Sequence, residues 1–448
     1  MALPEDTIVA VATPPGRGGL GIVRLSGPGA RPIAAGLVAE PAELYPRHAT
    51  FTRLSLDGRR PVDHAVITFF QAPASYTGED VVEISAHGSP VLLREIVEAA
   101  VAGGARLAGP GEFTLRAFLN GRIDLVQAEA VSDLIAATTP LQARAAFDQL
   151  DGTLTARIEA IDGRLMDVIA PLEASLDFPE EGYHFIAPAE TAERLGAIAA
   201  DVNALVEEGR RGRLIREGIT AAVVGRPNVG KSSVFNRLAG ADRAIVTESP
   251  GTTRDLITEG VEIEGIPVTL VDTAGLRDAA DAAEAEGVRR ARRSVGAAEL
   301  LIVVLDGSEP LREADASVLH ETKERRRVVA VNKSDRPEVW NGHAVPAHVR
   351  VSAKTGEGFA DLRRAIARAA GAGSAREPAA ITNVRHIALL ERAGEAIARA
   401  RASAADGASE ELVLADLHDA RGAFEDVTGR RSADDLLNEI FGRFCIGK

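Results

Sequence analysis

The chain has 448 residues, of which 46% are hydrophobic and 26% are charged, and its formal net charge is −14. This length allows two to four domains, and the composition is ordinary for a soluble globular protein. The negative charge argues against a protein that holds nucleic acid mainly by charge, because binding to phosphates requires clustered Lys and Arg. A single cysteine, Cys445, excludes an intrachain disulfide and fits a reducing compartment.

The amino-terminal sequence carries acid where a secretory signal would carry base, and no apolar run approaches the length of a membrane span. We therefore expect a cytoplasmic protein with no membrane span.

The first part of the chain has the pattern of an α+β domain. Segments 7–12, 21–25, 62–70 and 81–85 are β-like, and 91–101 has the apolar periodicity of a helix. A loop rich in Gly and Pro, residues 13–19, separates the first two predicted strands, and such a loop lets another backbone or a flat ligand come close.

Helical periodicity begins near Phe113 and continues to about residue 216, with Pro140, Pro171, Pro179 and Pro188 predicted to divide it into separate helices. Helices resume after a linker-like stretch, 370–378. Because helical segments flank an α/β insert, we expect one discontinuous helical domain. The predicted domains are 1–118 (α+β), 119–216 (helical, first part), 217–376 (inserted Ras-like P-loop G domain) and 377–448 (helical, second part, with the tail).

A phosphate-binding motif follows the apolar run 219–224: Gly225-Arg-Pro-Asn-Val-Gly-Lys231-Ser232. A strand, a glycine loop and a helix in this order are what such a loop requires. Its backbone N–H groups cradle phosphates, Lys231 reaches the β- and γ-phosphates, and Ser232 offers a hydroxyl to Mg²⁺.

Three further motifs follow in the order expected of a guanine-nucleotide switch domain. The first is Asp272-Thr-Ala-Gly275, where a carboxylate supports Mg²⁺ and a backbone N–H senses the γ-phosphate. The second is Asn332-Lys333-Ser334-Asp335, whose terminal carboxylate accepts from N1–H and the 2-amino group of guanine. The third, Ser352-Ala353-Lys354, completes a base pocket. The ordered set predicts a GTP-hydrolysing enzyme.

Leu276 follows the Asp-Thr-Ala-Gly motif where many GTPases carry a glutamine that orients the attacking water. Another group must act instead: a carboxylate, an arginine or a bound cation. The candidates are Glu284, Glu286, Arg254, Arg277 and, as a ligand of a monovalent ion, Asn228. A first switch needs a loop that brings a hydroxyl to Mg²⁺; in the preceding segment Thr252 or Thr253 can serve, and spacing alone does not choose between them.

Several stretches resemble the bacterial tRNA modification GTPase MnmE (TrmE) family. They are the opening segment 6–27, Tyr76-Thr-Gly-Glu79-Asp-Val-Val-Glu83, Arg-Pro-Asn-Val in the phosphate loop, Gly251-Thr-Thr-Arg-Asp255, and the final Phe444-Cys445-Ile-Gly-Lys448. The resemblance implies an amino-terminal domain similar to tetrahydrofolate-binding domains that also forms a homodimer. It further implies GTP hydrolysis stimulated by K⁺ when two G domains meet.

The resemblance also implies roles for individual residues. Asn228, Thr247, Ser249 and Thr252 would surround K⁺, Ser232 and Thr253 would hold Mg²⁺, and Glu284 would orient the water. The residues implied to contact GTP are Asn228, Val229, Gly230, Lys231, Ser232, Ser233, Thr247, Glu248, Ser249, Pro250, Gly251, Thr252, Thr253, Asp272, Thr273, Ala274, Gly275, Asn332, Lys333, Asp335, Ser352, Ala353 and Lys354.

The implied folate site consists of Arg24, Glu83, Arg122 and Lys448, with Cys445 as a catalytic thiol near it. Position 122 is Arg where the family has Lys, which keeps the charge but changes the geometry. The family acts with the FAD protein MnmG, as a heterotetramer, on the wobble uridine of certain tRNAs. It forms 5-carboxymethylaminomethyl or 5-aminomethyl uridine, with 5,10-methylene- or 5-formyl-tetrahydrofolate as the one-carbon source.

A regulatory GTPase of ribosome assembly or membrane signalling is the alternative, with the amino-terminal domain serving only for dimerisation. The G-domain motifs do not separate the two functions. The amino-terminal block and the Cys-Ile-Gly-Lys tail favour tRNA modification, since a ribosome-assembly factor would more naturally carry a basic RNA-binding domain.

Overall fold

The structure is a computed structural model that describes residues 5–40, 43–56, 60–177, 186–241, 257–272, 298–337, 339, 345, 347–371, 381–431 and 433–448. The chain divides into two compact units. The first comprises Met1–Ser132 and Glu425–Lys448, and the second comprises Asp133–Phe424. Helices α4 (Leu125–Ala136) and α13 (Glu410–Thr428) contain the two points at which this division falls.

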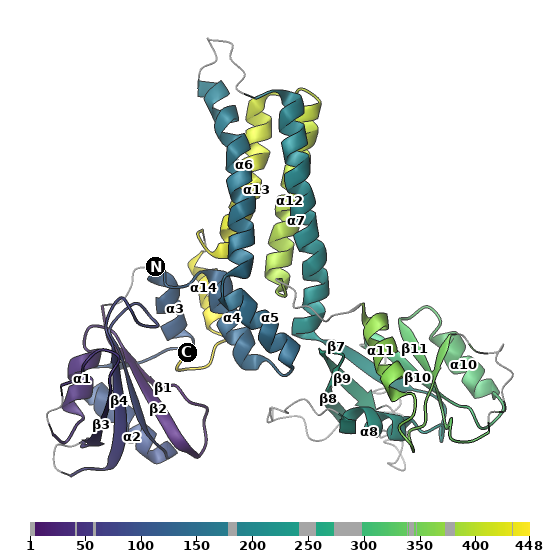
Figure 1. Ribbon diagram of the computed structural model, residues 1–448, viewed down its shortest axis with the longest axis horizontal. Coiled ribbons are helices and arrows are strands. Elements are labelled where there is room, and N and C mark those ends of the chain that lie inside the picture. The colour runs from purple at the N-terminus through teal and green to yellow at the C-terminus, as the bar shows by residue number, and fades with distance from the viewer. Residues whose placement is uncertain are drawn as a thin grey trace. The chain divides into compact units, whose positions relative to one another are not determined.

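The first unit is built on a six-stranded sheet in the order β3-β4-β5-β2-β1-β6 (Figure 1). All neighbouring pairs are antiparallel except β1 and β6, which are parallel. Its strands are β1 (Ile8–Val11), β2 (Gly18–Ser26), β3 (Ala49–Leu54), β4 (Asp63–Phe70), β5 (Val81–Gly88) and β6 (Arg106–Leu107).

One face of this sheet is covered by α1 (Ala30–Gly36) and α2 (Pro90–Ala102). Alternate residues of the central strands, such as Leu25 and Ile84, are fully buried there. The residues between them point to the opposite face, which is what the two-residue period of a strand requires. The opposite face therefore carries the half-buried polar side chains of β2 and β5.

The four predicted strands and the helix 91–101 are present, but the sequence pattern missed α1, β3 and the two-residue strand β6. In β3 only Leu54 is buried, and Phe51 is 71% exposed. An edge strand with so little burial has no hydrophobic alternation to read.

The carboxyl terminus belongs to the first unit. Helices α3 (Glu112–Leu119) and α14 (Asp434–Phe441) pack together. Phe441 of α14 belongs to an apolar cluster that also contains Leu125 and Phe444. The last residues then pair with the segment before α3, through a bridge between Pro110 and Ile446.

The second unit contains long helices and a second sheet. The helices are α5 (Pro140–Leu150), α6 (Thr153–Asp177), α7 (Pro188–Glu217) and α12 (Val384–Ala405), together with most of α13. Helices α7 and α12 pack along their length, and α6 packs on α7 (Figure 1). Buried Leu390, Ala393 and Ile397 recur every three or four residues on α12, which is the stripe of an amphipathic helix.

The prolines behave differently from the sequence prediction at one position. Pro140 and Pro188 begin α5 and α7, as predicted, and Pro179 lies outside the described residues. Pro171, however, lies inside α6 and does not end it. The carbonyl that loses its helical donor belongs to exposed Asp167, where water can replace the bond, while buried Val168 and Leu172 hold the helix in place.

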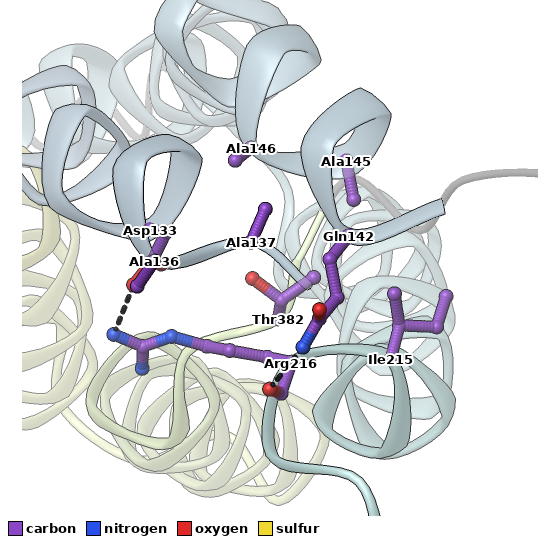
Figure 2. Close-up of a pocket in the computed structure, with 9 residues that line it drawn as sticks. All are labelled: Asp133, Ala136, Ala137, Gln142, Ala145, Ala146, Ile215, Arg216 and Thr382. Carbon is purple, nitrogen blue, oxygen red and sulfur yellow. Dashed lines mark hydrogen bonds and ion pairs between the residues drawn. The ribbon is translucent and has the colours of Figure 1, made fainter. Parts of the chain in front are cut away.

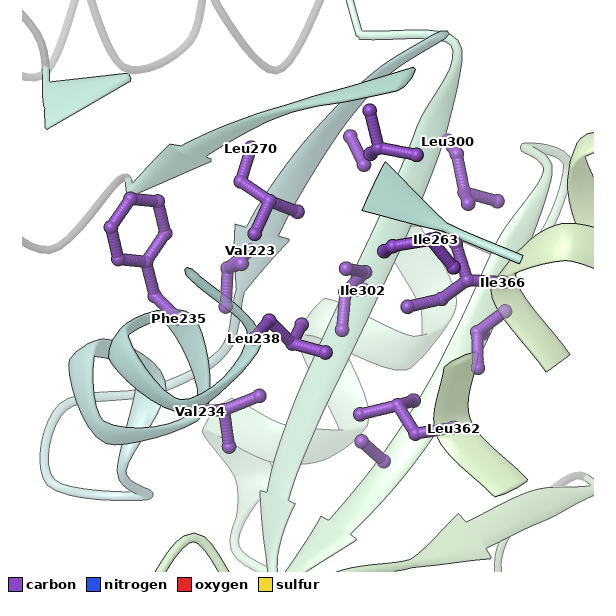
Figure 3. Close-up of a cluster of buried hydrophobic side chains, with 14 of the residues drawn as sticks. Val223, Val234, Phe235, Leu238, Ile263, Leu270, Leu300, Ile302, Leu362 and Ile366 are labelled. Carbon is purple, nitrogen blue, oxygen red and sulfur yellow. The ribbon is translucent and has the colours of Figure 1, made fainter. Parts of the chain in front are cut away.

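The second sheet has the order β12-β11-β10-β7-β9-β8. Its strands are β7 (Ile219–Val224), β8 (Ile257–Ile263), β9 (Ile266–Asp272), β10 (Leu300–Asp306), β11 (Arg327–Asn332) and β12 (His348–Arg350), and only β8 is antiparallel to its neighbour. Helices α8 (Lys231–Ala241) and α11 (Phe359–Ala370) cover one face, where their residues form a continuous core with the strands (Figure 3). Helix α10 (Glu313–Glu321) packs on the other face.

Candidate functional site

The predicted phosphate loop lies between β7 and α8, at the carboxyl edge of the parallel strands. Asn228 has φ +64°, and Gly230 has φ +94°. A Cβ atom on Gly230 would lie 2.3 Å from Asn332 Nδ2, so only glycine fits there. Lys231 donates from Nζ to the carbonyl of Arg226 at 2.9 Å, and Ser232 and Ser233 are exposed in the first turn of α8.

The beginning of the loop is anchored by a buried ion pair. Arg226, 8% exposed, donates from Nε to both carboxylate oxygens of Asp315 at 3.1 and 2.9 Å, and from Nη2 to Glu309 at 3.0 Å. Asp315 is 2% exposed and also accepts from the backbone N–H of Arg312 at the start of α10. The pair therefore ties the phosphate loop to α10.

Replacing Asp315 by Asn is expected to destabilise the second unit by about 3 kcal/mol and to weaken nucleotide binding, because Arg226 would remain buried with less compensation. Thermal unfolding and nucleotide titration would measure both effects. Replacing exposed Arg312, which pairs with Glu309, by Gln is the control and should change stability by less than about 0.5 kcal/mol. Equal effects of the two variants would contradict the anchoring role.

The motif after β11 reaches back to the phosphate loop. Asn332, 2% exposed, donates from Nδ2 to the carbonyl of Val229 at 2.9 Å and accepts from the backbone N–H of Ala353 at 3.0 Å. It thus joins the phosphate loop to the Ser352-Ala353-Lys354 motif. Lys333 donates to the carboxylate of Asp306 and to the carbonyl of Asn228 at 3.2 Å.

Asp335 is exposed beside this junction and accepts from Ser352 Oγ at 2.7 Å. This hydrogen bond, with a smaller contribution from the charge of Lys354, lowers the pKa of the Asp335 carboxyl. The group is therefore an ionised acceptor at neutral pH, with one oxygen oriented by Ser352. Such a carboxylate can accept two N–H groups from one edge of a base.

Sequence reasoning missed two acids that support this site, Asp315 and Asp306. Asp306 is 2% exposed at the end of β10. Burial alone would raise the pKa of its carboxyl, but hydrogen bonds from Lys333 and Ser308 outweigh it, so that the pKa is lowered. Asp306 could have been predicted from the sequence, because it ends an apolar run as Asp272 does. Asp315, the partner of Arg226, lies 89 residues away from it, and no sequence pattern marks it.

Asp272 is buried at the end of β9, which pairs in parallel with β7, so that Val223 lies opposite Asp272. The remaining predicted nucleotide, metal and catalytic residues of this domain lie outside the described residues. They are Thr247, Glu248, Ser249, Pro250, Gly251, Thr252, Thr253, Thr273, Ala274, Gly275 and Glu284.

The first unit brings together two of the four predicted folate residues directly. Arg24 and Glu83 face each other on β2 and β5, and Arg24 donates to Glu83 Oε1 from Nε at 2.9 Å and from Nη2 at 2.8 Å. The Arg24 guanidinium also lies 5.4 Å from the ring centre of Tyr76 and 5.7 Å from that of Phe113. Both charged groups are partly exposed on the sheet face that α1 and α2 leave open.

The carboxyl-terminal tail reaches the same place. The backbone N–H of Phe113 donates to the carbonyl of Lys448 at 3.2 Å, and Phe113 in turn lies against Arg24. Cys445 is exposed, and its carbonyl accepts from the backbone N–H of Gly111 at 3.4 Å. Arg122 is also exposed, with its Cγ close to the backbone of Gly78. No hydrogen bond or ion pair among the described residues joins Arg122 to the other three.

A mostly parallel sheet with a phosphate loop after β7, an acid at the end of β9 and an Asn-Lys-Ser-Asp motif after β11 defines the class of Ras-like P-loop GTPases. Here this domain is inserted between the helices α7 and α12. The family model "MnmE helical domain" matches residues 125–445, and "GTP-binding protein TrmE N-terminus" matches residues 7–122. The chain belongs to the tRNA modification GTPase MnmE family.

Relatives of this family match over their full length. The chain is 46% identical to the tRNA modification GTPase MnmE of Koribacter versatilis, covering 99% of each chain. It is 44% identical to that of Thiobacillus denitrificans, covering 99% of this chain and 98% of the relative, and 40% identical to that of Aquifex aeolicus, covering 99% and 100%.

Among solved structures, the G domain of the T. maritima FeoB iron transporter matches 34% of this chain and 98% of its own, at 26% identity. Its TM-score is 0.25, which is too low to support a conclusion. In the described part of the chain, every helix is too short or too polar to span a lipid bilayer.

Proposed function

We propose that this chain hydrolyses GTP in the modification of tRNA. Together with the flavoprotein MnmG it would form 5-carboxymethylaminomethyl or 5-aminomethyl uridine at the wobble position, with a one-carbon unit from a folate. One observation carries this proposal. The tail docks on Phe113, which lies beside the Arg24–Glu83 pair, in the same chain as an Asn-Lys-Ser-Asp motif whose Asp335 carboxylate is oriented by Ser352.

The nucleotide would bind along the carboxyl edge of the second sheet. Val229, Gly230, Lys231 and Ser233 would surround the phosphates, and Asn332, Lys333, Asp335, Ser352, Ala353 and Lys354 would hold the base. Glu248, Pro250, Gly251, Thr273, Ala274 and Gly275, outside the described residues, would complete the contacts. The bond from Asn332 to Val229 supports this assignment, because it brings the base pocket and the phosphate loop to one site.

Two cations are proposed at the phosphates. Ser232 with Thr253 would hold Mg²⁺, and Asn228 with Thr247, Ser249 and Thr252 would hold K⁺, while Glu284 orients the attacking water. The exposed Ser232 hydroxyl at the start of α8 and the Asp272 carboxylate at the end of β9, the strand beside β7, suit a hard cation. The Asn228 side chain is exposed and makes no hydrogen bond among the described residues, which leaves its amide oxygen available as a ligand.

Exchanging K⁺ for Na⁺ at constant ionic strength is expected to slow GTP hydrolysis about 10²- to 10³-fold, because a cation aimed at the transferring phosphoryl group stabilises charge that develops in the transition state. Phosphate release assays would measure the rates. The Asn228→Ala variant should lose most of the difference between the two ions while still binding GTP. Equal rates in K⁺ and Na⁺ for the unaltered protein would overturn the ion assignment.

Arg24, Glu83, Arg122 and Lys448 are proposed to bind 5,10-methylene- or 5-formyl-tetrahydrofolate, which would supply the one-carbon unit, with Cys445 as a reactive thiol nearby. The donor set suits the ligand. Basic side chains match its glutamate carboxylates, and Glu83 matches the guanidine-like edge of the pterin. The half-buried Arg24 and Glu83, beside the rings of Tyr76 and Phe113, support this assignment.

We propose the domain boundaries 1–118, 119–216, 217–376 and 377–448. The end of α7 at Glu217 and the start of β7 at Ile219 support the second boundary. The helical domain would transmit movements of the G domain. Thr139, the N-cap of α5, donates from Oγ1 to the carbonyl of Gly265, in the turn between β8 and β9, at 2.9 Å.

A second contact supports this transmission. Arg216, at the end of α7, forms an ion pair with Asp133 at 2.7 Å, and Gln142 donates from Nε2 to the Arg216 carbonyl at 2.9 Å (Figure 2). Because β7 follows Arg216 after two residues and leads into the phosphate loop, this contact lies on the chain path between helices and nucleotide.

A homodimer, a heterotetramer with MnmG, and tRNA as the RNA partner complete the proposal. Action on tRNA in bacteria supports a cytoplasmic location. The name of the relatives, tRNA modification GTPase, supports the RNA partner.

The test is nucleoside mass spectrometry of tRNA from bacteria that lack the endogenous factor. Cells would carry this chain or its Asp272→Ala variant, in each case with the native MnmG of this chain's source. We expect the C5-modified wobble uridines to return only with the unaltered chain. If they stay absent while the purified chain hydrolyses GTP, the alternative of a regulatory GTPase replaces this proposal.

A further inference from the structure

Arginines that are far apart in sequence meet in one groove of the second unit. The groove has a volume of about 470 Å³ and lies between α7, α12, the end of α11 and the turn before β11. We call it the arginine groove, after the four arginines that line it: Arg210, Arg211 and Arg213 of α7, and Arg326. More than a hundred residues separate Arg326 from the other three, so only the fold brings them together.

The lining of the groove has an excess of positive charge although the chain as a whole has a net charge of −14. Among the described residues two acids line it, Glu207 and Glu391, and both pair with Arg210, at 2.6 and 2.9 Å. Arg213 is paired to acids outside the lining, Glu217 at 3.3 Å and Glu299 at 3.9 Å. The four arginines and these four acids balance in formal charge, but the acids pair with Arg210 and Arg213, and the remaining two arginines have no acid paired with them among the described residues.

Arg211 and Arg326 are exposed and make no side-chain hydrogen bond or ion pair with any part of the chain that the structure describes. Two uncompensated guanidinium groups at one groove attract an anion that can contact both of them. Guanidinium forks bind phosphate oxygens in a bidentate manner.

The groove is distinct from the nucleotide site. Arg326 immediately precedes β11, and the α7 arginines precede β7, so the groove lies at the amino ends of these strands. The phosphate loop and the Asn-Lys-Ser-Asp motif follow the carboxyl ends of the same strands. A ligand in the arginine groove would therefore not compete with GTP.

We propose that the arginine groove binds the sugar-phosphate backbone of the tRNA on which this chain acts, an assignment that rests on the proposed function. The two unpaired guanidinium groups contact phosphates, and the apolar residues Leu214 and Val384 of the lining contact the sugars. Because these groups read no base edge, the groove supplies affinity and orientation and does not select the sequence.

The test is binding of purified tRNA to the full chain, measured by fluorescence anisotropy over a series of KCl concentrations, for Arg211→Glu and Arg326→Glu. Each reversal should weaken binding about tenfold at low salt and make the slope of log K against log salt shallower by about 1. The control is Arg401→Glu. Arg401 lies ten residues beyond Glu391 on α12, about 15 Å further along the helix, and should behave as the unaltered chain.

Unchanged tRNA affinity in both groove variants overturns the proposal. Absence of tRNA binding by the unaltered chain also overturns it. Displacement of tRNA by poly-L-glutamate at the same charge concentration would overturn it too, and would assign the groove to an acidic protein. GTP hydrolysis without tRNA, and thermal unfolding, should be the same in all variants. Analysis of wobble nucleosides in cells that lack the endogenous factor separates this proposal from the proposed function. If the groove variants bind tRNA normally and still restore the modification, the groove proposal is wrong and the proposed function stands.

Discussion

Replacing Asp335 by Asn is expected to change the nucleotide preference of this chain from guanine to xanthine. The ionised carboxylate accepts from N1–H and the 2-amino group of guanine, whereas an amide offers one acceptor and one donor. Xanthine carries an oxygen where guanine carries the 2-amino group, and so accepts from the new donor. GTP affinity should fall on the order of 10²- to 10³-fold and XTP affinity should rise by a similar factor.

Titration with fluorescent GDP and XDP analogues would measure this change. Asp361→Asn is the matched control, because Asp361 is an exposed aspartate of α11 that pairs with Arg364, and its loss removes the same charge. Ser352→Ala should lower GTP affinity by a smaller factor and should not raise XTP affinity, since Ser352 orients the carboxylate and accepts from the backbone N–H of Thr355. A variant at position 335 that keeps its preference for GTP would remove Asp335 from base recognition.

Replacing Gly447 by Ala is expected to displace the carboxyl-terminal tail and to weaken folate binding by about tenfold or more. Gly447 has φ +97°, and a Cβ atom there would lie 2.2 Å from the carbonyl oxygen of Val11. An alanine therefore meets both an unfavourable backbone conformation and a clash with β1. Lys448 and Cys445, on either side of it, would move with the tail.

Gly104→Ala separates the clash from the backbone effect. Gly104 has φ +104°, close to that of Gly447, but a Cβ atom there would meet nothing within 4 Å. Equilibrium binding of 5-formyl-tetrahydrofolate should be weakened in Gly447→Ala and in Arg24→Ala, and unchanged in Gly104→Ala. GTP affinity should be the same in all three. Normal folate binding by Gly447→Ala would mean that the docked tail is not needed for the site.

The G-domain site was predictable in outline because each of its motifs is a short stretch that follows a buried strand. Apolar runs predicted β7, β9 and β11, and the polar residues directly after them mark the carboxyl edge of the sheet. The carboxyl ends of these strands lie at the same edge of the sheet because the strands are parallel. What the motifs did not predict is the support of the site, such as Asp315 holding Arg226 and Asp306 holding Lys333, since these partners lie on other elements.

The amino-terminal site shows the same limit more strongly. Arg24 and Glu83 were named only through the family resemblance, since their pairing depends on β5 lying beside β2 although β3 and β4 come between them in the chain. The docking of the tail against β1 and α3 depends likewise on a contact between the two ends of the chain. The periodicity of hydrophobic residues within a segment does not predict contacts between residues that are far apart in the chain.

The sequence by itself determined the class of fold, the discontinuous helical segments and the order of the nucleotide motifs, because each depends on residues close together in the chain. Tertiary structure alone decided that Pro171 continues α6, that the tail docks against β1 and the segment before α3, and that Arg326 shares one groove with three arginines of α7. The physical reason is common to all three. Burial, charge compensation and close backbone approach are set by neighbours in space, which a linear pattern does not specify.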